Sequence, residues 1–306
     1  MIPSAQALRN IAASSLDFDE GPTTTYFENC FASTEITDVL AALRGPDKEK
    51  WCESIGKEHA QHEKHKTLGP PQPQPPAGVK AIPFEILLKI KRDKTAKARG
   101  VIKGFHMQAG LHFNETFSPV PNISTLKFMF AIAAQLNWEG KSGDVNTAFL
   151  APKIDTDIWV RVPKYFNAKP TAADTGYDYR RVLKGIPGIP QGPRLFYRHI
   201  SPVLITQGLQ QCKAEHTLFF NSEKQLYVVV WVDDLFFFFP TIAMSNAADL
   251  YAGLRGKLDL GEWEDIQDCL GCTVKRDRIN KRLTLSQEHQ QGNSTIQNVI
   301  RQYRTD

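Results

Sequence analysis

The sequence has no long hydrophobic run, and this argues against a membrane-spanning helix. Its most apolar stretch, from Tyr227 to Phe239, is shorter than the ~20 residues that such a helix needs, and it carries Asp233 and Asp234 near its centre. Two aspartates in the middle of a bilayer would be strongly unfavourable. We therefore expect no membrane partner.

Cysteine is scarce, and neither charge is in large excess. The five cysteines are odd in number and no secretory leader follows Met1, so we expect reduced thiols in an intracellular protein, cytoplasmic or nuclear. A net charge of +4 is too small to hold a nucleic acid by itself, so such a partner needs a local basic patch. The segment 89–103 provides one, because only Asp93 opposes its cations, Lys89, Lys91, Arg92, Lys94, Lys97, Arg99 and Lys103.

Internal repeats are also missing, so the organisation is read from composition. Hydrophobic residues make up 42% and charged residues 23%, which is typical of a folded globular chain. Residues 1–68 have a weak pattern with one expected helix at 48–66. The proline-rich stretch 69–79 predicts a semi-rigid linker, followed by the main folded region, 80–290, and a tail, 291–306.

The main region alternates strand and helix signals. The segment 185–194 is too rich in glycine and proline for a regular element. The expected elements are a strand at 82–90, a helix capped by Ser124, a helix at 195–207 ended by Gly208, and a strand pair at 218–220 and 226–239.

Two adjacent aspartates, Asp233 and Asp234, lie between β-branched and aromatic residues in VVVWVDDLFFFF. Neighbouring strand residues point to opposite faces, and buried charges are unfavourable unless they are paired or bind a metal. The tip of a hairpin would let at least one carboxylate reach solvent and a divalent cation. A β-turn without function is the competing interpretation, and the long strand-like flanks count against it.

A third carboxylate, Asp144, follows Gly143. Hard cations require clustered oxygen ligands, and phosphoryl transfer commonly uses two Mg²⁺ ions ~4 Å apart. Asp144, Asp233 and Asp234 are therefore candidate ligands of a two-metal site.

Five motifs resemble those of copia-type retrotransposon reverse transcriptases, in the family's order and approximate spacing. YVVVWVDDLFFF is similar to the family's YVDD box, with Trp231 where tyrosine is usual, and SGDVNTAFL resembles DVKTAFL. KARGVIKGF resembles KARLVAKGF, IPGIPQGPR resembles YGLKQSPR, and NETFSPV recurs at Asn114–Val120. The resemblance covers the chain from about residue 82 to about residue 290.

The resemblance implies a fold and an activity. The fold is α+β, a right-hand polymerase with fingers and palm, in which an antiparallel sheet packs on helices and the thumb is partial or absent, as in a truncated or diverged copy. The activity is RNA-directed DNA polymerisation with two Mg²⁺ ions, or Mn²⁺ in their place. The partners are an RNA template, a DNA primer and dNTPs.

Residue roles follow from the same resemblance. Asp144 and Asp233 are the principal metal ligands, and Asp234 completes the catalytic-metal site. Lys91 and Arg99 match cations that the fingers place against the triphosphate; a solvated basic loop or a nonspecific template contact is the competing interpretation.

Two further positions match the nucleotide site. Phe149 matches the bulky ring that blocks a ribose 2′-hydroxyl, with ordinary core packing as the alternative. Gln191 matches the glutamine that contacts the incoming nucleotide or supports the fingers.

The chain departs from the family pattern in places. Gly100 replaces a usual leucine, GIPGIP lacks the usual tyrosine, and residues 1–80 align poorly, but no metal ligand is lost. Two hypotheses stay open: an active polymerase, favoured by the three aspartates, and a catalytically silent nucleic-acid-binding remnant, favoured by the truncation.

Two weaker signals are interpreted as structural. His59, His62 and His65 lie three apart without HExxH spacing, which predicts a solvated helix face and not a metal site. Cys269 and Cys272 have CxxC spacing with no second pair, so structural cysteines are expected.

Overall fold

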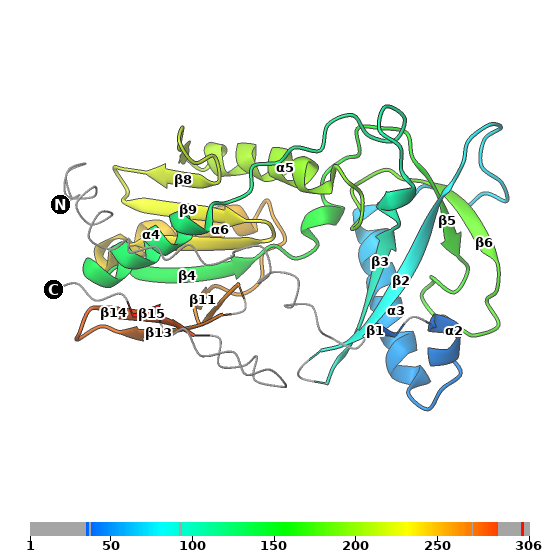
Figure 1. Ribbon diagram of the computed structural model, residues 1–306, viewed down its shortest axis with the longest axis horizontal. Coiled ribbons are helices and arrows are strands. Elements are labelled where there is room, and N and C mark those ends of the chain that lie inside the picture. The colour runs from blue at the N-terminus through cyan, green and yellow to red at the C-terminus, as the bar shows by residue number, and fades with distance from the viewer. Residues whose placement is uncertain (1–34, 37, 92–93, 271, 287–300, 303–306) are drawn as a thin grey trace. The chain divides into compact units, whose positions relative to one another are not determined.

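A computed structural model describes residues 35–36, 38–91, 94–270, 272–286 and 301–302 (Figure 1). The chain divides into two compact units. Of the described residues, unit 1 holds those of Pro119–Asn146 and Ser201–Asp306, and unit 2 holds those of Phe31–Ser118 and Thr147–Ile200. Both units combine helices with largely antiparallel sheet, which confirms the α+β class. Within the described ranges, no helix is long and apolar enough to cross a membrane.

Unit 1 is built on a six-stranded antiparallel sheet in the order β11-β4-β10-β9-β8-β7. Its strands are β4 (Glu139–Asp144), β7 (Gln210–Gln211), β8 (Leu218–Asn221), β9 (Leu226–Trp231), β10 (Asp234–Phe239) and β11 (Glu264–Asp265). The predicted strand pair is confirmed, and its second member is itself a hairpin because the chain turns at 232–233.

Strand β10 is covered on both faces, which explains its run of four phenylalanines. Phe236 and Phe238 belong to the same core cluster as helix α4 (Ile123–Gln135). On the other face, the Phe237 ring lies 5.5 Å from that of Tyr251, on helix α6 (Met244–Arg255), measured between centroids. A strand buried on both faces has a continuous apolar sequence instead of an alternating one.

Helix α4 is confirmed, but its predicted cap is wrong. The side chain of Asn122 accepts a hydrogen bond of 2.9 Å from the backbone N–H of Ser124, so Asn122 is the N-cap. Asparagine and serine are both good caps, and Asn122 has the extended backbone that a cap requires.

A second, smaller sheet of unit 1 contains β12 (Asp268–Cys269), β13 (Cys272–Asp277), β14 (Arg282–Ser286) and β15 (Arg301–Gln302). Cys269 and Cys272 are directly opposite in the β12–β13 hairpin. Cys269 is buried in the core cluster that includes α4, as a structural cysteine would be.

Unit 2 contains a five-stranded sheet in the order β1-β2-β5-β6, with β3 paired to β2. Its elements are β1 (Glu35–Ile36), α2 (Val39–Ala42), α3 (Lys48–His65), β2 (Ile82–Ile90), β3 (Ala96–Ile102), η2 (Gly104–His106), η3 (Ala148–Leu150), β5 (Trp159–Pro163) and β6 (Tyr177–Arg181). The strand expected at 82–90 and the helix expected at 48–66 are confirmed.

Helix α5 (Gly192–Thr206) begins among residues of unit 2 and ends among residues of unit 1. It starts three residues before the predicted position. Gly208 has a φ of 86°, and its N–H donates to the carbonyl of Ile205, so it ends the helix as predicted. A further short helix of unit 1, η4 (Thr241–Ala243), leads into α6.

The proline-rich stretch 69–79, expected as a linker between domains, lies within unit 2. The N–H of Gly69 donates to the carbonyl of Arg181 over 2.8 Å, and Gln72 and Tyr179 exchange two hydrogen bonds of 2.9 Å. Prolines leave few donors, and the N–H groups of Gly69 and Gln72 bond to β6, whereas that of Val79 donates to the carbonyl of Pro76 within the stretch. The first part of the stretch therefore runs beside β6.

The histidines of α3 do not lie on a solvated face, so that prediction is wrong. His62 is buried, and its Nδ1 lies 2.7 Å from the Thr67 hydroxyl. The His59 ring packs edge-on against Phe166 at 5.2 Å, and its pKa is lowered mainly by burial. Helix α3 turns this face toward the core of unit 2, where Nε2 of His62 lies 3.5 Å from the Glu58 carboxylate.

The same packing explains Gly100. A Cβ placed on Gly100 would lie 2.5 Å from Cζ of Phe84 and 3.1 Å from Nε2 of His62. The Gly100 N–H donates to Oε1 of Glu58 over 2.9 Å. Phe84 and His62 thus occupy the space that a side chain at position 100 would need.

We expect Gly100→Ala to lower the free energy of unfolding by about 1–3 kcal/mol, because the added methyl meets an aromatic ring in a closely packed core. Urea unfolding followed by circular dichroism measures the change. Gly45→Ala is the matched control, since its Cβ would make an ordinary contact of 3.4 Å. Equal stability of the two variants would contradict this account of Gly100.

Candidate active site

The aspartates of the candidate site lie where β4 ends and β10 begins. Asp144 is the last residue of β4 and is directly opposite Asp234, the first residue of β10. Opposed residues of an antiparallel pair have Cβ atoms about 5 Å apart on one face of the sheet. Asp144 is exposed and Asp234 is partly buried. The strand register therefore makes neighbours of two side chains that are far apart in the sequence.

Asp233 lies in the two-residue loop of the β9–β10 hairpin. Its carbonyl accepts a hydrogen bond of 2.8 Å from the N–H of Val145, which ties the loop to the residue after Asp144. Val232, the other loop residue, has a φ of 51°. A positive φ is unusual for a β-branched residue, and such strain costs on the order of 1–3 kcal/mol. The hairpin tip is thus held in a strained conformation beside the carboxylates.

The three carboxylates interact electrostatically. Burial raises the pKa of Asp234 to about 6, and the negative charges of Asp233 and then Asp144 add to the effect. Like charges that share a site disfavour ionisation, whereas a cation at the site would reverse the effect. The arrangement is therefore suited to a positive partner.

The donor set fits Mg²⁺ or Mn²⁺. Carboxylate oxygens are the ligands that these hard cations prefer. In the side-chain positions of the described residues, no group of three or more His, Cys, Asp or Glu side chains is preformed around one point. Asp144 and Asp234 are already paired through their backbones, so rotation about their side-chain bonds would be enough to bring their oxygens together.

Sequence reasoning missed a segment that supports Asp144 from the other side. The carbonyl of Asp144 accepts a hydrogen bond of 2.9 Å from the N–H of Gly261. The N–H of Asn146 donates a hydrogen bond of 2.7 Å to the carbonyl of Asp259. Backbone hydrogen bonds thus fix Asp144 at the end of its strand, β4. The motif LDLGEWED marks this segment, but nothing in it indicates that it pairs beside Asp144.

The predicted dNTP-binding residues belong to unit 2. Lys91 and Arg99 are exposed on the β2–β3 hairpin, where Arg99 is opposite Leu87. Lys97 is directly opposite Lys89 in the register of the two strands. The hairpin therefore presents cations from both of its strands.

Phe149 is half-buried. Its ring lies 6.2 Å from that of Phe196, and a Cβ on Gly192 would be 3.5 Å from its Cδ1. Phe149 thus packs beside the first turn of helix α5.

Gln191 is fully buried. Its Nε2 donates to the carbonyl of His112 over 3.1 Å and to the hydroxyl of Thr156 over 3.2 Å. These bonds join three loop segments.

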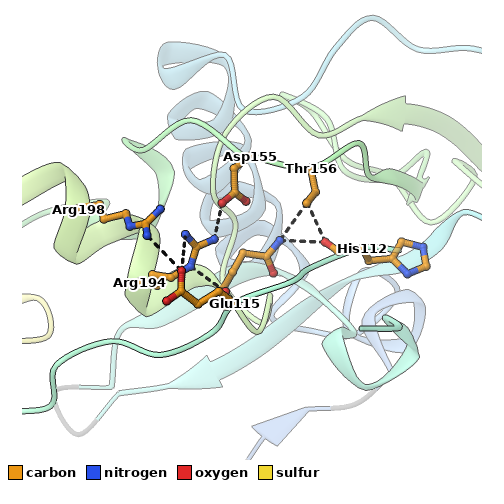
Figure 2. A network of polar contacts seen from close by, with 7 residues as sticks. His112, Glu115, Asp155, Thr156, Arg194 and Arg198 are labelled. Carbon is orange, nitrogen blue, oxygen red and sulfur yellow. Dashed lines mark hydrogen bonds and ion pairs between the residues drawn. The ribbon is translucent and has the colours of Figure 1, made fainter. Parts of the chain in front are cut away.

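Arg194 extends the same network (Figure 2). Its guanidinium, almost fully buried, donates to the carbonyl of Glu115 over 2.7 Å and forms an ion pair with Asp155. Arg198 contacts the Glu115 carboxylate at 3.1 Å. Glu115 belongs to the motif NETFSPV and Arg194 to the motif IPGIPQGPR, so these contacts join two of the five motifs.

The raised pKa of Asp234 predicts a pH-dependent stability. A carboxylate with a raised pKa favours the folded state below its ordinary value of 3.8, and that contribution is lost as the pH rises through about 6. We expect Asp234→Asn to raise the free energy of unfolding of the metal-free protein at pH 7–8 by on the order of 1 kcal/mol, since solvent screens a partly exposed carboxylate.

Urea unfolding at pH 4, 6 and 8 measures this effect, with Asp249→Asn on the exposed side of α6 as the control. The gain should shrink toward pH 4. A gain that is independent of pH would contradict the electrostatic explanation.

Comparison with known proteins gives a consistent result. A family described as "Reverse transcriptase (RNA-dependent DNA polymerase)" matches residues 73–300. The chain is 26% identical over 266 residues to the Retrovirus-related Pol polyprotein from transposon TNT 1-94 of Nicotiana tabacum, a match that covers 83% of this chain and 19% of the relative. It is 27% identical over 271 residues to the corresponding protein from transposon RE2 of Arabidopsis thaliana, covering 86% of this chain and 18% of the relative.

A third relative, the Pol polyprotein from transposon RE1 of Arabidopsis thaliana, is 28% identical over 256 residues, which is 80% of this chain and 16% of the relative. The chain thus spans less than a fifth of the length of these relatives. All three come from copia-type transposons, as the five motifs predicted. The chain belongs to the reverse transcriptase (RNA-dependent DNA polymerase) family.

Proposed function

We propose that this chain carries the polymerase site of a copia-type reverse transcriptase and extends a DNA primer on an RNA template. The observation that carries the proposal is the register of β4 and β10, which pairs Asp144 with Asp234 and puts Asp233 in the adjoining loop. The raised pKa of Asp234 supports it, because a site that repels its own charges favours a cation.

The proposed reaction is nucleotidyl transfer. Asp144, Asp233 and Asp234 would hold two Mg²⁺ ions. When bound, these ions supply the Lewis acidity that lowers the pKa of the primer 3′-hydroxyl and neutralises charge on the triphosphate. The 3′-hydroxyl gives up its proton to solvent, and its oxygen forms a bond to the α-phosphorus. The bond from that phosphorus to the oxygen that bridges to the β-phosphate breaks, and pyrophosphate leaves. No protein nucleophile is required.

We assign unit 1 to the palm and unit 2 to the fingers. Unit 1 contains the three carboxylates on an antiparallel sheet that packs against helices on both faces. Unit 2 contains the basic β2–β3 hairpin with Lys91 and Arg99. The cations on both strands of this hairpin support a polyanionic partner, either the triphosphate or the template backbone.

Phe149 and Gln191 would shape the nucleotide site. The half-buried Phe149 ring presents an apolar surface that a ribose 2′-hydroxyl would clash with. Gln191, held by His112 and Thr156, would keep the surrounding loops in position.

The first test is Mg²⁺-dependent dNTP incorporation on a primed RNA template. We expect the wild-type chain to extend the primer and Asp233→Asn to lose activity roughly hundredfold or more, because an amide is a poor ligand for a hard cation. Asp249→Asn is the matched control, and circular dichroism checks the fold of each variant. A folded wild-type chain that binds template without incorporating nucleotide would overturn the proposal and identify a silent nucleic-acid-binding remnant.

A second test concerns sugar selection. We expect Phe149→Val to raise the relative use of rNTPs by about tenfold or more, because the smaller side chain leaves space for the 2′-hydroxyl. Incorporation of dGTP and GTP is compared in single-turnover assays, with Phe117→Val, at a highly exposed phenylalanine, as the control. An unchanged ratio would assign Phe149 to packing alone.

A further inference from the structure

Tyr251 has a position in unit 1 that packing alone does not explain. Its ring is buried on α6 between Phe237, at 5.5 Å, and Trp263, at 5.2 Å. Its hydroxyl extends past these rings and donates a hydrogen bond of 3.0 Å to the carbonyl of Gly261. Burial is the main reason that the pKa of Tyr251 is raised, so the hydroxyl keeps its proton at neutral pH.

The same hydroxyl lies over β4. A Cβ on Gly143 would be 2.7 Å from the Tyr251 oxygen and 2.8 Å from its Cε2. Any side chain at position 143 would therefore displace Tyr251. The residue before Asp144 is a glycine because a tyrosine occupies the space above it.

Gly261 connects Tyr251 to Asp144. The N–H of Gly261 donates to the Asp144 carbonyl over 2.9 Å, while its own carbonyl accepts from Tyr251. On the opposite edge, the N–H of Val145 donates to the carbonyl of Asp233. The backbone around Asp144 is thus held between the catalytic hairpin and a segment that Tyr251 anchors.

We propose that Tyr251 is a positioning residue that fixes Asp144 for metal binding, through the hydrogen bond of its hydroxyl to Gly261. The part of this inference that concerns metal binding rests on the proposed function, since it assigns Tyr251 to the site where Asp144 would bind Mg²⁺. The ring alone would still fill the space between Phe237 and Trp263, so the hydroxyl is the part that acts on the site.

The variant that isolates this contact is Tyr251→Phe, which keeps the ring and removes one hydrogen bond. Tyr227→Phe is the matched control. Tyr227 is a partly buried tyrosine of the same sheet, stacked on Trp138 at 5.3 Å, and it precedes the hairpin tip by most of β9. Gly143→Ala serves as a second variant that presses on Tyr251 from β4. Gly140→Ala is its control, because there the nearest atom to the added Cβ is Cδ1 at the flexible end of Ile266, 3.2 Å away, and the Phe238 ring lies at an ordinary contact distance of 3.8 Å.

Two measurements on the whole chain decide the matter. Hydrogen exchange by mass spectrometry, without metal, follows peptides covering 141–147 and 257–263. Calorimetry measures the affinity for Mg²⁺. We expect Tyr251→Phe to raise exchange in those peptides and to weaken Mg²⁺ binding, each by about fivefold, the effect of one net hydrogen bond. Exchange in the core of β9 and β10 should stay unchanged. If Tyr251 had a purely structural role, the substitution would raise exchange in these strands as well.

The inference would be overturned if neither Tyr251→Phe nor Gly143→Ala changed exchange at 141–147 and 257–263. It would also be overturned if the wild type bound Mg²⁺ and Tyr251→Phe bound it with the same affinity. The exchange result does not depend on catalysis. If the wild type neither binds Mg²⁺ nor extends a primer, the proposed function fails, and selective exchange in Tyr251→Phe would still support the part of the inference that concerns the position of Asp144.

Discussion

Six successive residue pairs join β4 to β10, from Glu139 opposite Phe239 to Asp144 opposite Asp234. The candidate site depends on this ladder, because a slip by one residue would turn one of the two carboxylates to the other face of the sheet. Packing fixes the register: Phe236 and Phe238 fit against α4, whereas Phe237 and Phe239 fit against the rings of Tyr251 and Trp263. The packing of the aromatic core thus keeps Asp144 and Asp234 next to each other although their negative charges repel.

The site stores unfavourable energy in two forms. The carboxylates repel one another, which is seen in the raised pKa of Asp234, and Val232 has a backbone conformation that suits glycine or asparagine better. Both costs lie at the hairpin tip, and the well-packed strands behind it offset them. Such local conflicts are common at functional sites, where the requirements of chemistry and of stability differ.

What could be predicted from sequence was local. The strand Ile82–Ile90 and helix α3 follow from the spacing of apolar residues, and the turn at Asp233 follows because two adjacent aspartates do not fit within a buried strand. The parts that failed depend on contacts between distant segments. His62 was expected in solvent, but Phe84 and Phe166 cover it. Sequence nominated Asp144, Asp233 and Asp234, but the register that pairs Asp144 with Asp234, and the support from Gly261, arise only in the folded sheet.

The order of the strands along the chain has a consequence for synthesis. Strand β4 leaves the ribosome long before its partner β10, because the residues of β5, β6 and α5 come between them. An unpaired strand is a site for aggregation, and its composition decides how severe the risk is. The nascent β4, with the sequence EGKSGD, is polar, charged and rich in glycine, whereas the aromatic β10 emerges when β4 and β9 are both present to receive it. The hydrophobic half of the ladder is thus made last, which limits the time that it spends without a partner.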